Sequence, residues 1–167
     1  MEEMIEEVDW DGNVIAVHPR TLLKKRMFPH KASLVLPKTK EGKIILCKRA
    51  KDKHPFPGTW CCAVGGKVMA GETEEQAALR EMEEEVGFVR DLIKVTSFNY
   101  DEDDYKGLFT IFTTELSMND LNPNPSEIEF LQDFNIDEIG DMLKNSPDDF
   151  APTFRVAILE FIKNQIH

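Results

Sequence analysis

One stretch of this chain, from Gly66 to Phe88, carries acidic, basic and glycine residues at fixed intervals. It reads GKVMAGETEEQAALREMEEEVGF. In order, the pattern holds a glycine, a glutamate, an arginine–glutamate pair, an apolar residue, two adjacent glutamates, a glycine and an apolar residue. Nine specified positions in this order are not expected by chance in a chain of 167 residues. The stretch therefore constrains both the fold and the chemistry more than any other feature of the sequence.

Local signals in this stretch predict a helix between Thr73 and Gly87. Thr73 and Gln76 have the spacing of a capping box, in which each side chain bonds the backbone N–H of the other residue. Gly87 is a typical helix stop, because glycine adopts the left-handed conformation that ends many helices. The apolar residues of the segment recur on one face and can pack against a sheet; they are Ala78, Met82 and Val86.

Three glutamates of the predicted helix, Glu81, Glu84 and Glu85, share one face at positions i, i+3 and i+4. Like charges at this spacing destabilise a helix by roughly 0.2–0.5 kcal/mol per pair, so bound cations would explain the clustering. Carboxylate oxygens are ligands that suit Mg²⁺ or Mn²⁺. The alternative is an acidic helix that is only solvated. Gly65-Gly66, where the backbone can approach a metal or phosphate closely, favours the metal site.

The complete pattern resembles the Nudix box of the Nudix hydrolase superfamily at every fixed position. The resemblance implies an α/β fold, the Nudix α/β/α sandwich with a mixed sheet between helices, formed by residues 1–167 as a single domain. It also implies hydrolysis of a diphosphate linkage, in which Mg²⁺ or Mn²⁺ activates the attacking water. The metal ligands that it implies are Glu81, Glu84, Glu85 and the carbonyl of Gly65.

Further residues acquire roles from the same resemblance. Glu72 and Arg80 resemble orienting partners, because Arg80 is placed to hold Glu72 or Glu81 in position. The general base of such enzymes can be a glutamate of the box or an acid on a later loop, for which Glu127 is the candidate. The alternative for Glu127 is an ordinary charge at the entry of a strand. Its rivals in an acidic turn are Glu102, Asp103 and Asp104.

Outside the box, the segment KRAKDKHPFPGTW, residues 48–60, resembles the isopentenyl-diphosphate isomerase branch of the superfamily. Residues 29–32 and 147–155 fit that branch too, so the resemblance covers most of the chain. In that branch, cations at the positions of Arg49 and Lys53 contact the diphosphate. Two cations four residues apart could clamp phosphate oxygens that the metal leaves free. A solvated basic loop is the alternative.

Aromatic residues could supply the remainder of a substrate pocket. Trp60 and four other aromatic side chains could line a pocket that stacks on a nucleobase, or could belong to the core. The four others are Phe56, Tyr100, Phe109 and Phe154.

The isomerase reaction itself is disfavoured by two positions. The catalytic cysteine and a metal-binding histidine of the isomerase align with Gly65 and Lys67, which cannot supply these groups. Cys61 and Cys62 come too early in the sequence and are expected to pack on a strand. His18, like His30, is then expected to serve structure or the pocket rim. The prediction is a pyrophosphohydrolase of the isomerase-like branch that acts on a nucleoside di- or triphosphate or a related compound.

Two other functions stay open as alternatives: an isomerase in which another acid replaces the cysteine, and a non-catalytic nucleotide-binding module. The net charge of −11 argues against a nucleic-acid partner and against binding to anionic membranes. An acidic start, the lack of a long apolar run and an odd count of three cysteines fit a cytoplasmic protein. Apolar residues in excess of one face between 150 and 166 could pack on the sheet or form a homodimer contact.

Periodicity and turn signals predict the other elements. The predicted helices cover residues 18–27, 136–144 and 152–166. A hairpin is expected at 8–17. Further strands are expected at 31–36, 43–48, 60–64, 67–69, 92–100, 108–116 and 127–133. Gly65-Gly66 is expected to separate two short strands.

Overall fold

The computed structural model describes residues 2–165, which form three α-helices, nine strands and short 3-10 turns. The helices are α1 (Glu74–Val86), α2 (Ile136–Asn145) and α3 (Pro152–Lys163). The strands are β1 (Met4–Val8), β2 (Val14–Pro19), β3 (His30–Val35), β4 (Ile44–Arg49), β5 (Trp60–Cys62), β6 (Val64–Lys67), β7 (Ile93–Asp101), β8 (Lys106–Thr113) and β9 (Ile128–Phe134). No described helix is long and apolar enough to cross a membrane.

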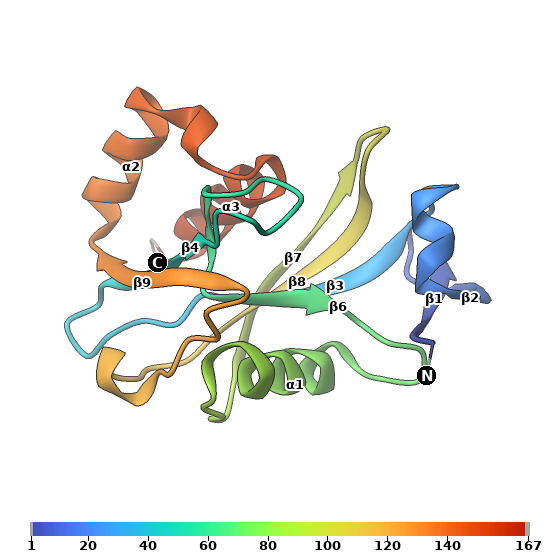
Figure 1. The fold of residues 1–167 in the computed structure, drawn as a ribbon, viewed down its shortest axis with the longest axis horizontal. Coiled ribbons are helices and arrows are strands. Elements are labelled where there is room, and N and C mark those ends of the chain that lie inside the picture. Colours follow the sequence, from blue (N-terminus) through green and yellow to red (C-terminus); the bar gives the residue numbers. More distant parts are fainter. Residues whose placement is uncertain (1, 166–167) are drawn as a thin grey trace.

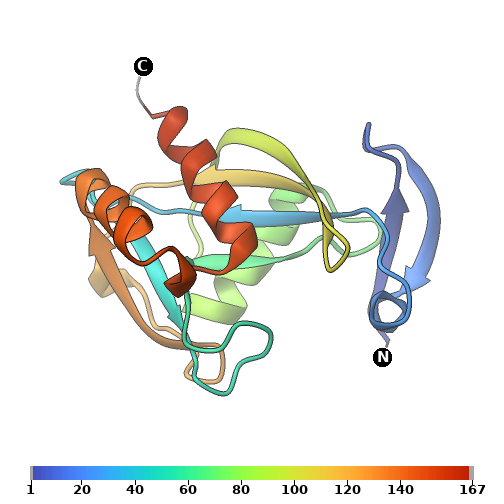
Figure 2. The same ribbon diagram turned by 90° about the horizontal axis from the view of Figure 1, so that it is seen from above.

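The strands form a mixed four-stranded sheet, an antiparallel three-stranded sheet and a separate hairpin. The larger sheet has the order β6-β3-β8-β7, in which only β3 and β8 run parallel. The smaller sheet has the order β5-β4-β9. Helix α1 lies on one side of the strands, and α2 and α3 lie on the other (Figure 1). The view from above shows α3 and α1 on opposite sides of the larger sheet (Figure 2). The predicted sandwich is thus confirmed.

Helix α1 begins and ends as its local signals predict. Thr73 and Gln76 form both hydrogen bonds of the capping box, and Gly87 ends the helix at φ 62°. The apolar face of the helix is buried and packs in one cluster with Val35 and Phe112 from strands β3 and β8. Helix α1 is therefore fixed along its length, which fixes the positions of its glutamates.

A second core cluster lies between the larger sheet and helix α3. Phe154, Ala157, Ile158 and Phe161 of α3 are all buried there. Leu159 remains exposed on the opposite side of this helix. Packing on the sheet thus accounts for most of the apolar excess predicted for this segment. The last residue of the predicted helix, Ile166, lies outside the described residues.

Three local predictions were wrong. Gly65 and Gly66 lie inside strand β6, and Lys67 ends that strand instead of beginning another. The sheets change between Cys62 and Val64, since β5 pairs with β4 whereas β6 pairs with β3. The N-terminal hairpin starts earlier, at Met4, and the helix expected at 18–27 is a 3-10 turn, Arg20–Lys24. Pairing partners decided these boundaries, and local propensity does not encode them.

Candidate active site

A cleft of about 490 Å³ opens between strand β6, the middle of helix α1 and the loop that follows β4. It brings together most of the residues that the sequence singles out. Its lining includes Arg49, Lys53, Gly65, Gly66, Arg80, Glu81, Glu84, Glu85 and Glu127. These residues come from distant parts of the chain: the end of β4 and the loop after it, strand β6, helix α1 and the turn before β9.

Arg80 is the centre of the polar contacts on the helix side of the cleft. Its Nε and Nη2 donate to the two carboxylate oxygens of Glu72, over 2.8 and 3.0 Å. Its Nη1 donates to Oε1 of Glu81 over 2.8 Å, and its Nη2 also reaches the carbonyl of Lys67 at 3.1 Å. The hydrogen bond from Arg80 lowers the pKa of Glu72, which stays ionised. Such a two-pronged contact fixes the orientation of the guanidinium group.

Two of the box glutamates are held in a confined, weakly solvated place. Burial raises the pKa of Glu81, although the hydrogen bond from Arg80 opposes the shift. Burial and the neighbouring charge of Glu81 raise the pKa of Glu85 to about 9. Oε2 of Glu85 accepts a hydrogen bond of 3.1 Å from the N–H of Gly65. Two carboxyl groups forced together in this way are stabilised as anions only when positive charge is added.

Gly66 leaves the space that Glu81 fills. A β-carbon built on Gly66 would lie 2.2 Å from Oε1 of Glu81 and 2.4 Å from its Cδ. Any side chain at this position would therefore displace the carboxylate. The glycine is needed here for clearance, and it sits within a strand instead of a flexible turn.

The residues present fit a hard divalent cation. The donors are carboxylate oxygens and a backbone carbonyl, which is the ligand chemistry that Mg²⁺ and Mn²⁺ prefer. A cation would also reverse the raised pKa values of Glu81 and Glu85. Among residues 2–165, no three acidic, cysteine or histidine side chains are already arranged as a metal site. The contacts show why: Arg80 pairs with Glu81 and approaches Glu84 at 3.6 Å, and Glu85 bonds to Gly65.

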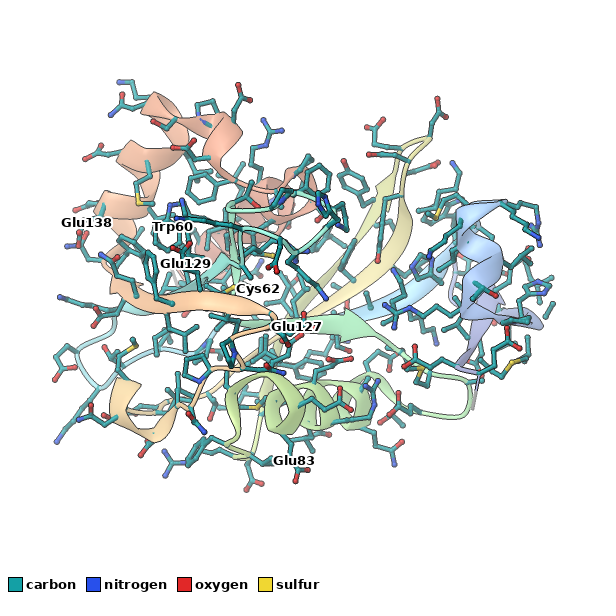
Figure 3. The ribbon with its side chains drawn as sticks, in the orientation of Figure 1. Trp60, Cys62, Glu83, Glu127, Glu129 and Glu138 are labelled. Atoms are coloured by element: carbon teal, nitrogen blue, oxygen red, sulfur yellow. The ribbon has the colours of Figure 1, made fainter. Side chains whose placement is uncertain are left out.

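The opposite wall carries the predicted base and the predicted phosphate contacts. Glu127 projects between strand β9 and the region of β6 and α1 (Figure 3). Its Oε2 pairs with Nζ of Lys53 over 2.6 Å. Nε of Arg49 is buried and has no hydrogen-bond partner among the described residues. A buried donor without a partner is costly, so an anionic ligand that reached this atom would be stabilised by it.

Trp60 lies away from the cleft. It points toward helix α2 (Figure 3), and its ring packs edge-on against Phe130 and Phe134 at 5.7 and 5.2 Å. Phe154 is also fully buried in the core, and Phe56 is exposed. Of the five aromatic residues expected for base stacking, only Phe109 lines the cleft. The structure therefore gives no support to Trp60 as a substrate contact.

The acidic turn and the two adjacent cysteines differ in how they relate to the cleft. Glu102, Asp103 and Asp104 are exposed and do not line the cleft, as expected of an acidic turn. Cys61 and Cys62 pack in the core but also line a small cavity of about 140 Å³. That cavity shares Arg49, Gly65, Glu85 and Glu127 with the cleft. The thiols are therefore closer to the candidate site than their sequence spacing suggested.

Sequence reasoning missed one group of cleft residues. Tyr105, in the turn between β7 and β8, lines the cleft together with Lys67, whose Nζ donates to its Oη. Buried His30 contacts both, at 3.2 Å from Lys67 Nζ and 3.2 Å from Tyr105 Oη. His18 instead pairs with Glu7 in the N-terminal hairpin. Tyr105 gave no motif signal, and only the topology places it beside the strand that ends at Lys67.

Comparisons with known proteins agree with this architecture. The family described as NUDIX domain matches residues 28–155. A prenyl-diphosphate phosphatase of Methanosarcina mazei is 28% identical over 163 residues, which cover 96% of this chain and 95% of the relative. An isopentenyl-diphosphate Delta-isomerase of Brevibacterium linens is 28% identical over 90% of this chain and 86% of its own. A solved structure from Deinococcus radiodurans superposes with a TM-score of 0.76 at 20% identity, covering 86% of this chain and 90% of that one.

Proposed function

Since the chain belongs to the NUDIX family, we propose that it is a metal-dependent hydrolase that cleaves a phosphorus–oxygen bond in a small diphosphate. One observation carries the proposal. The buried carboxylate of Glu81 and the half-buried carboxylate of Glu85 share a single cleft with the cations Arg49 and Lys53. Carboxylates on one wall suit a metal, and cations on another suit phosphate oxygens. A diphosphate bound between the walls would meet both.

Each residue of helix α1 that lines the cleft has a role in this proposal. Glu81, Glu84 and Glu85 would hold Mg²⁺ or Mn²⁺ together with the carbonyl of Gly65. When bound, the metal supplies an acidified water and charge neutralisation at the phosphoryl oxygens. Arg80 orients Glu81 and is itself held by Glu72, as the hydrogen bonds of the structure indicate.

Glu127 is our candidate for the general base. It lies in the cleft, and its charge contributes to the raised pKa of Glu85, so the two carboxylates are close. Its present partner is Lys53. A substrate phosphate that bonds to Lys53 would draw the ammonium away and leave Glu127 free to accept a proton from water.

The substrate class can be narrowed by the lining of the cleft. The resemblance of the sequence favours a nucleoside di- or triphosphate, but the residues expected to stack on a base lie mostly in the core. The apolar part of the lining is Ala32, Leu34 and Phe109, a floor that suits an aliphatic chain. The Methanosarcina relative, similar over its whole length, is named for prenyl diphosphates. We therefore propose a prenyl diphosphate as the first substrate to test and a nucleotide as the second.

The isomerase alternative finds less support. Gly65 and Lys67 stand where the isomerase branch needs a thiol and an imidazole. Cys61 and Cys62 lie near the cleft, but the hydrogen bond with Cys61 and burial raise the pKa of Cys62 well above its ordinary value. A non-catalytic binding module would have no use for carboxylates buried against each other, which destabilise a fold without a cation.

The test is ³¹P NMR of the protein with Mg²⁺ and a panel of prenyl diphosphates, nucleoside diphosphates and nucleoside triphosphates. Hydrolysis of a prenyl diphosphate to the monophosphate and inorganic phosphate would support the proposal. Exchange between allylic and homoallylic diphosphates without phosphate release would indicate an isomerase. Binding with neither reaction would indicate a non-catalytic module.

A further inference from the structure

His30, the first residue of strand β3, is a buried hydrogen-bond acceptor. Its side chain is 1% exposed, and its Nδ1 lies 2.9 Å from the carbonyl of Phe28. A carbonyl can only accept, so Nδ1 carries the proton and donates. Burial lowers the pKa of His30 to about 4, so the ring is neutral at pH 7 and Nε2 is left as an acceptor.

Lys67 donates a hydrogen bond to that acceptor. Its Nζ lies 3.2 Å from Nε2 of His30 and 3.2 Å from Oη of Tyr105, and 4.6 Å from the centre of the tyrosine ring. All three contacts are with neutral groups. Within residues 2–165, Lys67 forms no ion pair with a carboxylate. By contrast, Lys53, the other lysine of the cleft, is paired with Glu127.

A partly buried ammonium without a counter-charge is unfavourable unless an anion arrives. Arg20 lines the cleft as well, but it is paired with Glu3 at 2.8 Å. Lys67 is therefore a cation of the cleft whose charge is held in place by neutral partners and is not neutralised by them.

The pairing of the strands places Lys67 beside the apolar floor of the cleft. Lys67 lies opposite Ala32, and Gly65 lies opposite Leu34, in the pairing of β6 with β3. Alternate residues of a strand point to the same face, so Lys67 projects from the face on which Gly65 lies. Phe109 continues this floor, because it lies opposite Ala32 in the pairing of β3 with β8. All five residues line the cleft.

We propose that Lys67, positioned by His30 and Tyr105, binds a phosphoryl group of the substrate, as a cationic contact separate from Arg49 and Lys53. The inference rests on the proposed function, and it adds a binding residue and two positioning residues to it. The neutral partners suit this role: a carboxylate beside Lys67 would compete with the phosphate, whereas an imidazole and a phenol orient the ammonium without cancelling its charge.

The test is isothermal titration calorimetry with methylenediphosphonate, whose P–C–P bridge cannot be hydrolysed, in the presence of Mg²⁺. Lys67→Met keeps the aliphatic stem and removes the charge, and we expect it to raise Kd about tenfold. The matched control is Lys48→Met. Lys48 also lies over an aromatic ring, 4.8 Å from the centre of Trp60, but outside the cleft. Its removal should leave Kd within twofold of the original value.

The positioning residues are tested by a double-mutant cycle. His30→Leu removes the acceptor and should raise Kd severalfold, whereas His30→Gln, which retains an acceptor oxygen, should restore most of the affinity. In the Lys67→Met background, His30→Leu should have no further effect on Kd, because the group that it positions is gone. Additive effects would assign His30 a structural role only and overturn its part in the proposal.

The outcomes separate this inference from the proposed function. If the wild-type protein binds the diphosphonate through Lys67 but hydrolyses nothing, the inference stands and the proposed hydrolase function fails. A wild-type protein that hydrolyses its substrate with the same KM and the same diphosphonate Kd as Lys67→Met would overturn the inference alone. Absence of diphosphonate binding to the wild-type protein would overturn it as well. Thermal melts of each variant would show that the fold is retained.

Discussion

The carboxylate of Glu81 fills the space that a side chain on Gly66 would need: a β-carbon built on the glycine would lie 2.2 Å from Oε1 of the glutamate. Because Glu81 is also held by Arg80, the carboxylate cannot move aside without breaking a 2.8 Å hydrogen bond. The contact ties the position of a proposed metal ligand to the absence of a side chain on strand β6.

The first prediction concerns this contact. We expect Gly66→Ala to lower kcat at least ~100-fold and to destabilise the fold by about 1–3 kcal/mol, the usual cost of overpacking. Urea unfolding and steady-state kinetics would measure both. Gly140→Ala is the control, since nothing lies within 4 Å of its β-carbon in helix α2. It should stabilise the protein by roughly 0.5–1 kcal/mol and leave kcat unchanged. Normal activity in Gly66→Ala would contradict the proposed role of Glu81.

The second prediction separates two adjacent glutamates of helix α1. Both side chains are exposed, but Glu84 lines the cleft, whereas Glu83 projects away from the sheet (Figure 3). Glu84→Gln should lower kcat by about 100-fold, because it replaces an anionic ligand with a neutral one. Glu83→Gln should change kcat less than twofold. Mn²⁺ binding, followed by electron paramagnetic resonance, should weaken in the first variant only. Equal losses in both variants would indicate a general effect of helix charge.

The third prediction concerns the pair of Arg80 and Glu72. Arg80→Lys keeps the charge but cannot make the two-pronged contact, so we expect kcat to fall roughly tenfold or more. Glu72→Gln should have a similar effect, and the double variant should be little worse than either single one. Arg90→Lys is a suitable control, because Arg90 is exposed and, within residues 2–165, donates only to the carbonyl of Glu115. Independent, additive losses would show that Glu72 does not act through Arg80.

The fourth prediction follows from the lowered pKa of His30. Burial brings it from 6.5 to about 4, with Lys67 and Arg20 adding repulsion and Phe28 opposing the shift. An unfolded chain takes up a proton at this ring below about pH 6.5, and the folded protein does not, so stability falls as the pH drops. Between pH 7 and pH 5 the loss should be about 2 kcal/mol.

His30→Gln, which does not titrate, isolates this contribution. The free energies of unfolding of the two proteins should converge as the pH falls from 7 to 5, measured by denaturant titration at each pH. Parallel curves for the two proteins would show that His30 is not held neutral in the fold.

Local signals were sufficient for helix α1. The Thr73 and Gln76 capping box and the Gly87 stop each act within a few residues, so the sequence predicts them directly. The same holds for β7 and β8, since strands are predicted at 92–100 and 108–116. The spacing of the glutamates then places them on one helical face, and the box pattern supplies their chemistry.

Local sequence signals could not predict contacts between segments that are distant in the chain. His30 and Lys67 are separated by 37 positions, and His30 and Tyr105 by 75, so no local pattern relates them. Trp60 follows a segment whose composition is typical of a binding loop. In the structure it pairs with β4, and its ring packs against Phe134 and not in the cleft. Which face a residue of a three-residue strand presents depends on its partners, and the sequence alone did not identify them.

Two kinds of element build the walls of the cleft, and this separation bears on how the protein can diversify. The acidic groups come from α1, whose geometry is tied to β6 through Gly66 and Arg80. The apolar floor comes from β3 and β8, which carry Ala32, Leu34 and Phe109. Exchanges on that floor would change which organic group is accepted without disturbing the groups that we propose to perform the cleavage. A lineage could thus acquire new substrates while its reaction stays the same.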